Sequence, residues 1–482
     1  MTWGKWLLLG TISGALLFTG CGSTSSAAPA SSAVQLQLAV QISGSGSGTV
    51  TSNPAGINCG TTCGAAFSSG SQVTLTPAAQ AGSGFAGWSG ACSGTASCVV
   101  TVTSNSPVTA TFSPSVPTAS SPVAFVYVPS SSGTDSYEVN AFAAGLNGRL
   151  IPVAGSPFAA NVSNLAANGK YLFGVQGAAD IDSFSISPTG AIAQTSSINA
   201  QQFNQNDCGG PVGLFFDRTG ATLYDQDFYS DCANNSYQSF SVGSSNGGLN
   251  YVGLANAASP AFQSNLSFIG NNQYAYAGSC YVLSGPLIYG FIRNSDGTLT
   301  DLNLNTPIPA GSSGNSYCPG AFAADPTNHL AVVLQTTTSD YPPTADGSPQ
   351  LAVYAADEAG NLSTNSTSSN MPAASVGYYP ALALSPAANL LAVAGTGGLQ
   401  VFHFNGGNPI TRYTGQLLKD EVDQVVWDNN NHLYALSIAG NSAGKLFVFT
   451  ITPTGVAPAP GSPYTITKPQ SIAVSPRRSP AA

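Results

Sequence analysis

The sequence predicts an all-β fold in which a small disulfide-stapled β domain precedes a seven-bladed β-propeller. Apolar strands separated by turn residues recur from residue 123 onward, with a period of about 40 to 60 residues, the size of one four-stranded blade. Only 6% of the residues are charged, whereas 54 are Gly and 32 are Pro, which is typical of many short strands joined by turns. The last strand of the chain has no following strand with which to pair.

Six complete repeat units follow one another in this region. Each contains an apolar strand, a polar turn, a second strand, a third strand and a shorter fourth strand after a Gly-containing turn. Their first two strands read NVSNLAANGKYLFGV (from 161), GPVGLFFDRTGATLYDQ (210), FQSNLSFIGNNQYAYAG (262), CPGAFAADPTNHLAVVL (318), YPALALSPAANLLAVAG (379) and VDQVVWDNNNHLYALS (422). We expect each unit to form one blade.

The seventh blade is expected to form from both ends of the repeat region. Residues 124–158 supply a second, third and fourth strand but no first strand, whereas residues 469–475 supply a first strand and nothing else. We therefore expect 469–475 to pair with the strand near Phe125 to Val128. Ring closure of this kind removes free strand edges, which otherwise invite aggregation. The propeller is expected to span 123–476, with 477–482 as a tail.

Residues 34–113 form a separate unit of alternating apolar and small polar residues. The GWSG motif at 87–90, the four cysteines and the closing VTATF at 108–112 resemble a small all-β bacterial surface repeat found on exported proteins. Local pairing of Cys59 with Cys63 and of Cys92 with Cys98 is the simplest choice, and the two other connectivities stay open. Trp88 is expected to fill the core beside a disulfide rather than to bind a ligand. A Pro/Ser linker, 114–122, follows.

The N-terminus has the features of an export signal. Lys5 precedes a short apolar run that is interrupted by Gly, and Thr19-Gly20-Cys21 resembles the lipobox of bacterial lipoprotein signal peptides. The resemblance implies a signal peptide over 1–20, lipidation of Cys21 and a Ser/Ala tether over 21–33; an ordinary secretory signal is the alternative. We expect an exported protein of the bacterial cell envelope, at the outer membrane or cell surface, held to the membrane by a lipid anchor.

The charge distribution excludes some partners. Lys5 is the only charged side chain before Asp135, and the chain as a whole has a formal net charge of −9. Nucleic acid is therefore not expected to bind. The remaining partner classes are a carbohydrate, a peptide or an envelope protein, and we expect a monomeric propeller without a cofactor.

The motifs AFVYVPSSSG (from 124), GRLIPVAGSPF (148) and APAPGSPYTI (457) resemble the YVTN-type and lactonase-like seven-bladed propellers. The resemblance implies hydrolytic opening of a sugar-acid lactone by His, Arg and Glu on the central face, which needs a general base and a stabiliser of the developing oxyanion. These roles cannot be assigned to residues here. His329 and His432 fall in turns, where exposure to solvent is expected, and His403 falls in a strand expected to pack between blades. The Glu residues are dispersed, at Glu138, Glu358 and Glu421.

Four cysteines predict that disulfide-linked loops lie on one face of the propeller. Loops that enter a blade and loops that join its second and third strands lie on the same face, and all four cysteines fall in such loops. The pairs Cys208–Cys232 and Cys280–Cys318 are therefore expected. Long loops on a rigid scaffold are the usual place for binding.

The same loops supply the candidate ligand contacts. The residues proposed to face a ligand are Asp207, Tyr229, Asp231, Tyr317 and Tyr341, since tyrosine stacks on sugars and peptides. Asp207, Asp225, Asp227 and Asp231 could hold a cation through oxygen ligands, and Ca²⁺ would suit such a set. The alternatives are a solvated acidic loop pinned by a disulfide and tyrosines packed against neighbouring loops.

Two functions follow from these features. The favoured one is an envelope-anchored lipoprotein whose propeller is a non-catalytic binding or interaction scaffold. The alternative is a lactonase-like hydrolase in the same location. A cluster of His, Arg and Glu at the channel mouth would favour the enzyme, because a fold by itself does not determine an activity.

Overall fold

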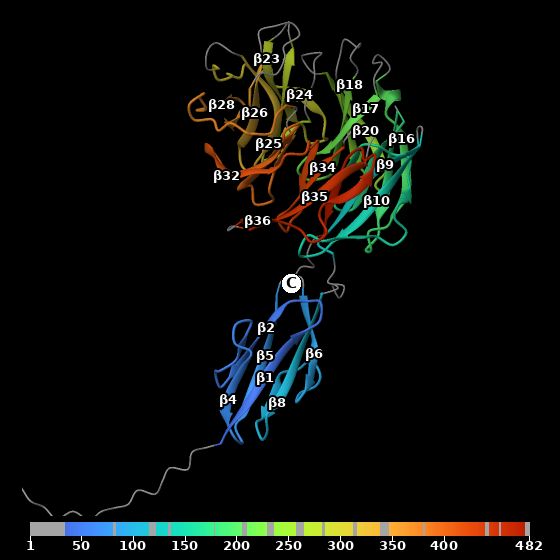
Figure 1. The fold of residues 1–482 in the computed structure, drawn as a ribbon. Helices are drawn as coiled ribbons and strands as arrows, with labels where there is room; N and C mark the ends of the chain where they lie inside the picture. The colour runs from blue at the N-terminus through green and yellow to red at the C-terminus, as the bar shows by residue number, and fades with distance from the viewer. Residues whose placement is uncertain are drawn as a thin grey trace, which may run out of the picture. The chain divides into compact units, whose positions relative to one another are not determined.

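A computed structural model describes residues 34–80, 83–114, 122–133, 136–177, 179–204, 210–228, 236–256, 265–281, 285–311, 316–337, 347–378, 381–438, 443–452 and 455–477. The chain divides into two compact units, Met1–Val116 and Pro117–Ala482 (Figure 1). Within the described ranges, regular structure consists of β-strands and one 3-10 turn at Gln201–Phe203. These ranges contain no helix of membrane-spanning length and hydropathy.

The N-terminal unit contains two four-stranded sheets with the orders β4-β1-β8-β6 and β3-β2-β5-β7. β1 and β8 pair in parallel, and the other pairs are antiparallel. The strands are β1 (Gln35–Ser43), β2 (Gly48–Asn53), β3 (Asn58–Cys59), β4 (Gly64–Ser68), β5 (Gln72–Ala79), β6 (Ser83–Gly90), β7 (Cys98–Thr101) and β8 (Ser106–Pro114).

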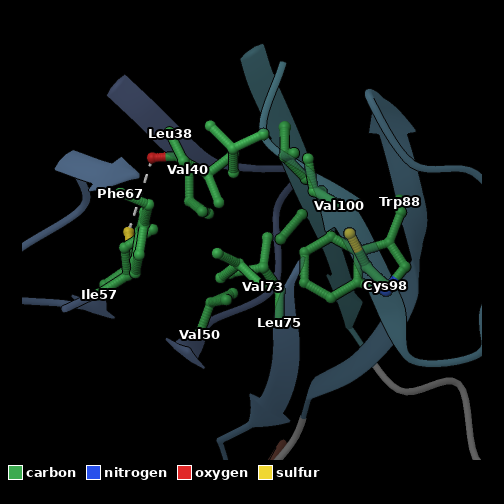
Figure 2. Packing of buried hydrophobic residues seen from close by; sticks show 14 of the residues in the cluster. Leu38, Val40, Val50, Ile57, Phe67, Val73, Leu75, Trp88, Cys98 and Val100 are labelled. Carbon is green, nitrogen blue, oxygen red and sulfur yellow. Dashed lines mark hydrogen bonds between the residues drawn. The ribbon is translucent and has the colours of Figure 1, made fainter. Parts of the chain in front are cut away.

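The core of this unit follows from the alternation in its strands. Leu38 and Val40 on β1 are buried, whereas the residues between and beside them are exposed. Val50, Val73 and Trp88 meet them in one cluster, which Figure 2 shows from close by. The alternation thus places one face of each strand in a shared core.

Both expected local disulfides are present, Cys59–Cys63 and Cys92–Cys98. Trp88 is buried, as expected, and its indole Nε1 donates a hydrogen bond of 2.9 Å to the carbonyl of Ala96. A domain of this size buries a limited core, so cross-links of this kind add needed stability.

The described part of the second unit forms seven sheets, five with four strands and two with a fifth strand added. Blade 1 combines β38 (Ala473–Pro476), β9 (Ala124–Gly133), β10 (Ser136–Ala144) and β11 (Leu150–Pro152), and β12 (Phe158–Ala159) also pairs with β10. The predicted seven-bladed propeller is confirmed.

Blades 2 to 7 follow in sequence order. Blade 2 has β13 (Leu165–Ala167), β14 (Tyr171–Gln176), β15 (Asp180–Ile186) and β16 (Ile192–Asn199), and blade 3 has β17 (Gly210–Phe216), β18 (Thr222–Phe228), β19 (Ser236–Val242) and β20 (Leu249–Asn256). Blade 4 has β21 (Ser267–Phe268), β22 (Tyr274–Tyr281), β23 (Gly285–Arg293) and β24 (Leu299–Asp301), and blade 5 has β25 (Ser316–Ala324), β26 (His329–Thr337), β27 (Gln350–Ala356) and β28 (Leu362–Ser363). Blade 6 has β29 (Ala381–Leu384), β30 (Leu390–Gly395), β31 (Gly398–Asn405) and β32 (Asn408–Leu418), and blade 7 has β33 (Gln424–Trp427), β34 (His432–Ser437), β35 (Ala443–Thr452) and β36 (Gly455–Pro458), with β37 (Tyr464–Thr467) also on β35.

The two ends of the propeller sequence meet in blade 1, as predicted. β38 pairs antiparallel with β9, and Val474 lies opposite Val126. Figure 1 shows β9 and β10 beside β34 and β35 of the last blade, although their sequences are far apart. The final strand of the chain therefore has its partner at the start of the propeller.

We letter the strands of each blade A to D from the centre of the ring outward. The A strands form the inner ring, because β38 contacts β13, β13 contacts β17, and β25, β29, β33 and β38 contact one another in succession. Two of the B strands, β30 and β34, are buried at every position. Such runs are expected where a sheet is covered on both faces.

Tyrosines on B strands join neighbouring blades. The hydroxyl of Tyr127 in blade 1 donates to the carbonyl of Gly190 in blade 2, and Tyr224 in blade 3 donates to Gly297 in blade 4. Tyr276 makes the equivalent bond to blade 5. Each acceptor glycine has a positive φ in its C–D turn, which glycine adopts without strain. Burial raises the pKa of these hydroxyls, which keeps them protonated as donors.

Candidate functional site

A cavity of about 860 Å³ opens on the face that carries the A–B and C–D turns. It is bordered by the A–B turns of blades 2 and 3, part of the A–B turn of blade 7, the C–D turn of blade 2 and the end of β38. Antiparallel pairing puts these turns at one end of the blades and the D–A and B–C loops at the other. The cavity therefore lies opposite the face on which we expected a binding site.

Arg218 lies in the A–B turn of blade 3 and lines this cavity. Its Nη1 donates to the carbonyls of Phe268 in blade 4, at 3.2 Å, and Ala324 in blade 5, at 3.3 Å. Its main-chain N–H donates to Asn272 Oδ1 at 2.9 Å. Burial lowers the pKa of Arg218, and the nearby Asp325 carboxylate acts in the opposite direction. These contacts fix the guanidinium across three blades.

Asp217 precedes Arg218 and is fully committed to the scaffold. Its Oδ2 lies 2.8 Å from Arg293 Nη2 and accepts a hydrogen bond of 3.1 Å from Asn272 Nδ2. Its Oδ1 accepts from Thr219 and from the main chain of the turn. The carboxylate side chain is fully buried, and its contacts with Arg293 and Asn272 link blade 3 to blade 4.

Two other cations line the cavity, Lys170 from blade 2 and Arg477 at the end of β38. The Lys170 ammonium donates to the carbonyl of Ser244 and lies 4.9 Å from the centre of the Tyr171 ring. The Arg477 guanidinium lies 5.7 Å from the centre of the Phe125 ring, an arrangement in which the ring face attracts the cation.

The A–B turns of blades 5 and 7 share an Asp-x-x-x-His sequence, in which the Asp carboxylate binds the His residue and stabilises the turn. Asp428 Oδ1 accepts the main-chain N–H of His432 at 3.0 Å, and its Oδ2 lies 2.7 Å from His432 Nδ1. Asp325 and His329 repeat this geometry in blade 5, with a ring contact of 3.1 Å. The expected exposure of His432 is wrong, since its side chain is completely buried. The carboxylate and the adjacent blade enclose the imidazole.

His403 differs from its expectation in one respect. It is half-buried in β31, and its ring packs edge-on against Tyr413 of β32, with ring centres 4.6 Å apart. The contact is therefore within blade 6, between its C and D strands, rather than the expected one between blades.

The described lining of the cavity lacks the residues of a hydrolytic centre. It includes three cations and Asp217, but no His and no Glu. Cations can stabilise a developing oxyanion, but activation of water needs a base with a free lone pair. Five residues donate to the Asp217 carboxylate or pair with it, so it is a poor candidate for that role.

Tyr317 is not a ligand-facing residue, which corrects the prediction. It lies in β25 rather than in a loop, its side chain is buried, and its hydroxyl donates to Gln350 Oε1 at 2.7 Å. Burial raises the pKa of this hydroxyl. Tyr317 belongs to the core between blades 4 and 5.

The predicted cation site is only partly within the described residues. Asp225 and Asp227 lie in β18 rather than in a loop, and Asp225 is fully buried opposite Gln238 of β19. In the part of the chain that is described, no three His, Cys, Asp or Glu side chains gather closely enough to hold a metal ion. The predicted ligands Asp207 and Asp231 lie outside the described residues, as do Cys21, Cys208, Tyr229, Cys232 and Tyr341.

Cys318 is disulfide-bonded, and it lies in β25 rather than in the expected loop. Cys280 likewise lies in a strand, β22, which contacts β25. The two strands belong to neighbouring blades, so the expected Cys280–Cys318 pair remains a prediction that the adjacent backbones favour.

Sequence reasoning missed the cationic cavity. Arg218 lies in the short turn DRTG, and Arg477 lies in the segment predicted to be a tail. The available signal was the scarcity of basic residues, since only 11 Lys and Arg occur in the chain.

Comparison with known families identifies one segment. Residues 38–116 match the family of divergent InlB B-repeat domains. This match agrees with the predicted small all-β repeat. No curated protein matches the chain.

Several solved structures resemble the propeller. A candidate 6-phosphogluconolactonase from Bacteroides fragilis NCTC 9343 has a TM-score of 0.52 and 14% identity, covering 74% of this chain and 99% of that one. A second candidate 6-phosphogluconolactonase, from Bacteroides uniformis ATCC 8492, has a TM-score of 0.55 and 13% identity, covering 73% and 99%. The periplasmic gluconolactonase PpgL of Pseudomonas aeruginosa has a TM-score of 0.50 and 16% identity, covering 73% and 98%. At these identities the likeness establishes the lactonase-like propeller fold and leaves activity open.

Proposed function

We propose that this protein is an exported, lipid-anchored envelope protein whose propeller binds a ligand without transforming it. The lipobox-like Thr19-Gly20-Cys21 supports the anchor. The disulfides of the N-terminal unit support export, because disulfides persist in oxidising compartments.

The residues that line the cavity support the proposal that the propeller binds its ligand without catalysis. Its described lining offers cationic donors to a ligand, whereas its carboxylate, Asp217, is held by Arg293 and Asn272. A site that can bind but has no available base is suited to recognition rather than to hydrolysis.

Hydrolysis of a lactone is the second candidate. It is favoured by the shared fold with solved structures named as gluconolactonases and by the cations, which could stabilise an oxyanion. In this alternative, Asp217 would have to leave its ion pair to act as the base.

A hydrolysis assay separates the two functions. Five- and six-membered sugar lactones are incubated with the purified protein at constant pH, and the alkali needed to neutralise the released acid is recorded. The scaffold proposal predicts the rate of buffer alone. A protein-dependent rate that Asp217→Asn abolishes would establish the hydrolase instead.

A further inference from the structure

Positive charge is concentrated at the cavity of an otherwise acidic protein. The chain has 11 Lys and Arg and a formal net charge of −9, yet Lys170, Arg218 and Arg477 all line one cavity. Random placement of so few basic residues does not favour such a cluster. The lining thus presents a local field opposite in sign to that of the whole molecule.

One edge of the Arg218 guanidinium makes no hydrogen bond to a described residue. Both contacts of its side chain to the scaffold, with the carbonyls of Phe268 and Ala324, use Nη1. No residue in the described part of the chain accepts a hydrogen bond from Nε or Nη2. The Nε–Nη2 edge of a guanidinium donates two parallel hydrogen bonds to a carboxylate or phosphate. Because Nη1 is anchored, this edge is held in place before a ligand arrives.

Arg477 offers a second guanidinium. Its side chain packs on the Phe125 ring, and no described carboxylate lies within ion-pair distance of it. The carboxylate that does line the cavity, Asp217, is neutralised by Arg293. Among the described residues, neither guanidinium group forms an ion pair, although the Asp325 carboxylate lies near enough to Arg218 to act on its pKa.

We propose that this cavity binds a small molecule through a carboxylate or phosphate group, with Arg218 and Arg477 as the two anion contacts. The volume of about 860 Å³ is in the range of small-molecule sites, which is roughly 300–1,000 Å³. Lys170 adds positive charge to the lining while its ammonium donates to the carbonyl of Ser244. This inference rests on the proposed binding function and names the ligand class of that scaffold.

Calorimetric titration of the full chain with three probes tests the inference. Citrate presents carboxylates, inorganic phosphate presents the alternative oxyanion, and glucose is an uncharged control. Binding of citrate or of phosphate, but not of glucose, is expected, and the stronger of the two identifies the preferred anion. Added NaCl should weaken this binding, since salt screens charge–charge attraction.

The variants Arg218→Gln and Arg477→Gln should each weaken anion binding about tenfold or more, because each removes a charge-assisted contact. Arg412→Gln is the matched control. Arg412 lies in β32 of blade 6, away from the cavity, and also donates to a main-chain carbonyl, that of Ala373, at 3.2 Å. Its substitution should leave affinity unchanged. If Arg218→Gln loosens the blades, the midpoint of its thermal unfolding will fall. The Arg477→Gln variant then still tests the inference.

Binding of neither anion by the wild-type protein would overturn the inference, as would equal binding by wild type and both cavity variants. An absence of anion binding together with an absence of lactone hydrolysis would leave the scaffold proposal standing and remove only the ligand class. Protein-dependent lactone opening would instead remove the scaffold proposal itself.

Discussion

His432 Nε2 lies 3.1 Å from the carbonyl oxygen of Leu146, so a contact between residues 286 positions apart joins blade 7 to blade 1. A carbonyl only accepts, so Nε2 must carry a proton. Nδ1 faces Asp428 Oδ2 at 2.7 Å, and Oδ2 also accepts the Tyr434 hydroxyl at 2.9 Å. The closing seam of the ring thus contains a buried cluster of Asp428, His432 and Tyr434.

We predict that His432→Ala destabilises the protein by about 3 kcal/mol or more, because it leaves the buried Asp428 carboxylate without its imidazole partner. His329→Ala is the matched control, since His329 sits in the same Asp-x-x-x-His turn but is 26% exposed. Its effect should be below about 1 kcal/mol. Urea unfolding measures both changes, and equal losses would show that the seam contact is not the source of the difference.

The Asp428 carboxyl makes this contribution depend on pH. Burial alone would raise its pKa, but the hydrogen bonds and charge of His432 reverse the shift, and the net pKa is lowered. A lowered folded-state pKa stabilises the protein above the ordinary Asp pKa of about 4, and that stabilisation disappears as pH falls through the folded-state pKa. The difference in unfolding free energy between wild type and Asp428→Asn should be largest above about pH 5 and shrink in acid. A pH-independent difference would contradict the assignment.

Removal of the closing strand should disrupt the ring. A chain truncated after Thr467 lacks β38, so β9 loses its inner partner and a gap opens beside β13 and β33. Exposed strand edges of this kind promote aggregation. We expect insoluble or partly unfolded protein, whereas truncation after Arg477, which retains β38, should leave the fold intact. Near-ultraviolet circular dichroism and light scattering distinguish the two, and a folded monomer after the shorter truncation would refute shared closure.

Cys318 should be joined to Cys280. β22 and β25, which carry these residues, are neighbours in adjacent blades, and Cys318 is disulfide-bonded. Peptide mapping without reduction should recover these two peptides linked, and should also show Cys208 linked to Cys232. Linkage of Cys318 to any other cysteine would contradict the pairing and the placement of four cysteines on one face.

Lipidation should depend on Cys21. Cys21→Ala should move the protein from the membrane fraction to the soluble fraction, because the lipid chain is the proposed anchor. Fractionation followed by immunodetection measures the change, with Cys59→Ala as a cysteine control that keeps the anchor. Retention of the Cys21→Ala protein in the membrane fraction would exclude lipid anchoring through this residue.

The architecture could be predicted because its signals are local or regularly repeated. Apolar strands recur with the spacing of a blade, and the unpaired strand at 469–475 matches a missing first strand near Phe125. The disulfides of the N-terminal unit join residues only a few positions apart, so spacing alone favoured them.

The site could not be predicted in the same way, since it is assembled from turns on separate blades. Arg218 and Arg477 meet at one cavity only because the ring closes. The sequence predicts that His432 is an exposed turn residue, whereas in the structure its imidazole contacts the carbonyl of Leu146 in blade 1. Tyr317 reads as a loop residue because β25 extends further toward its N-terminal end than the apolar pattern indicates.

The most direct test of binding without turnover follows both processes in one sample. ¹³C-labelled glucono-δ-lactone is mixed with the protein, and nuclear magnetic resonance records the spontaneous ring opening and the line widths of the open acid. We predict an opening rate equal to that of buffer, with broadening of the carboxylate signal that Arg218→Gln and Arg477→Gln relieve. An opening rate proportional to protein concentration would contradict binding without turnover, and a carboxylate signal that stays sharp with the wild-type protein would contradict carboxylate binding at Arg218 and Arg477.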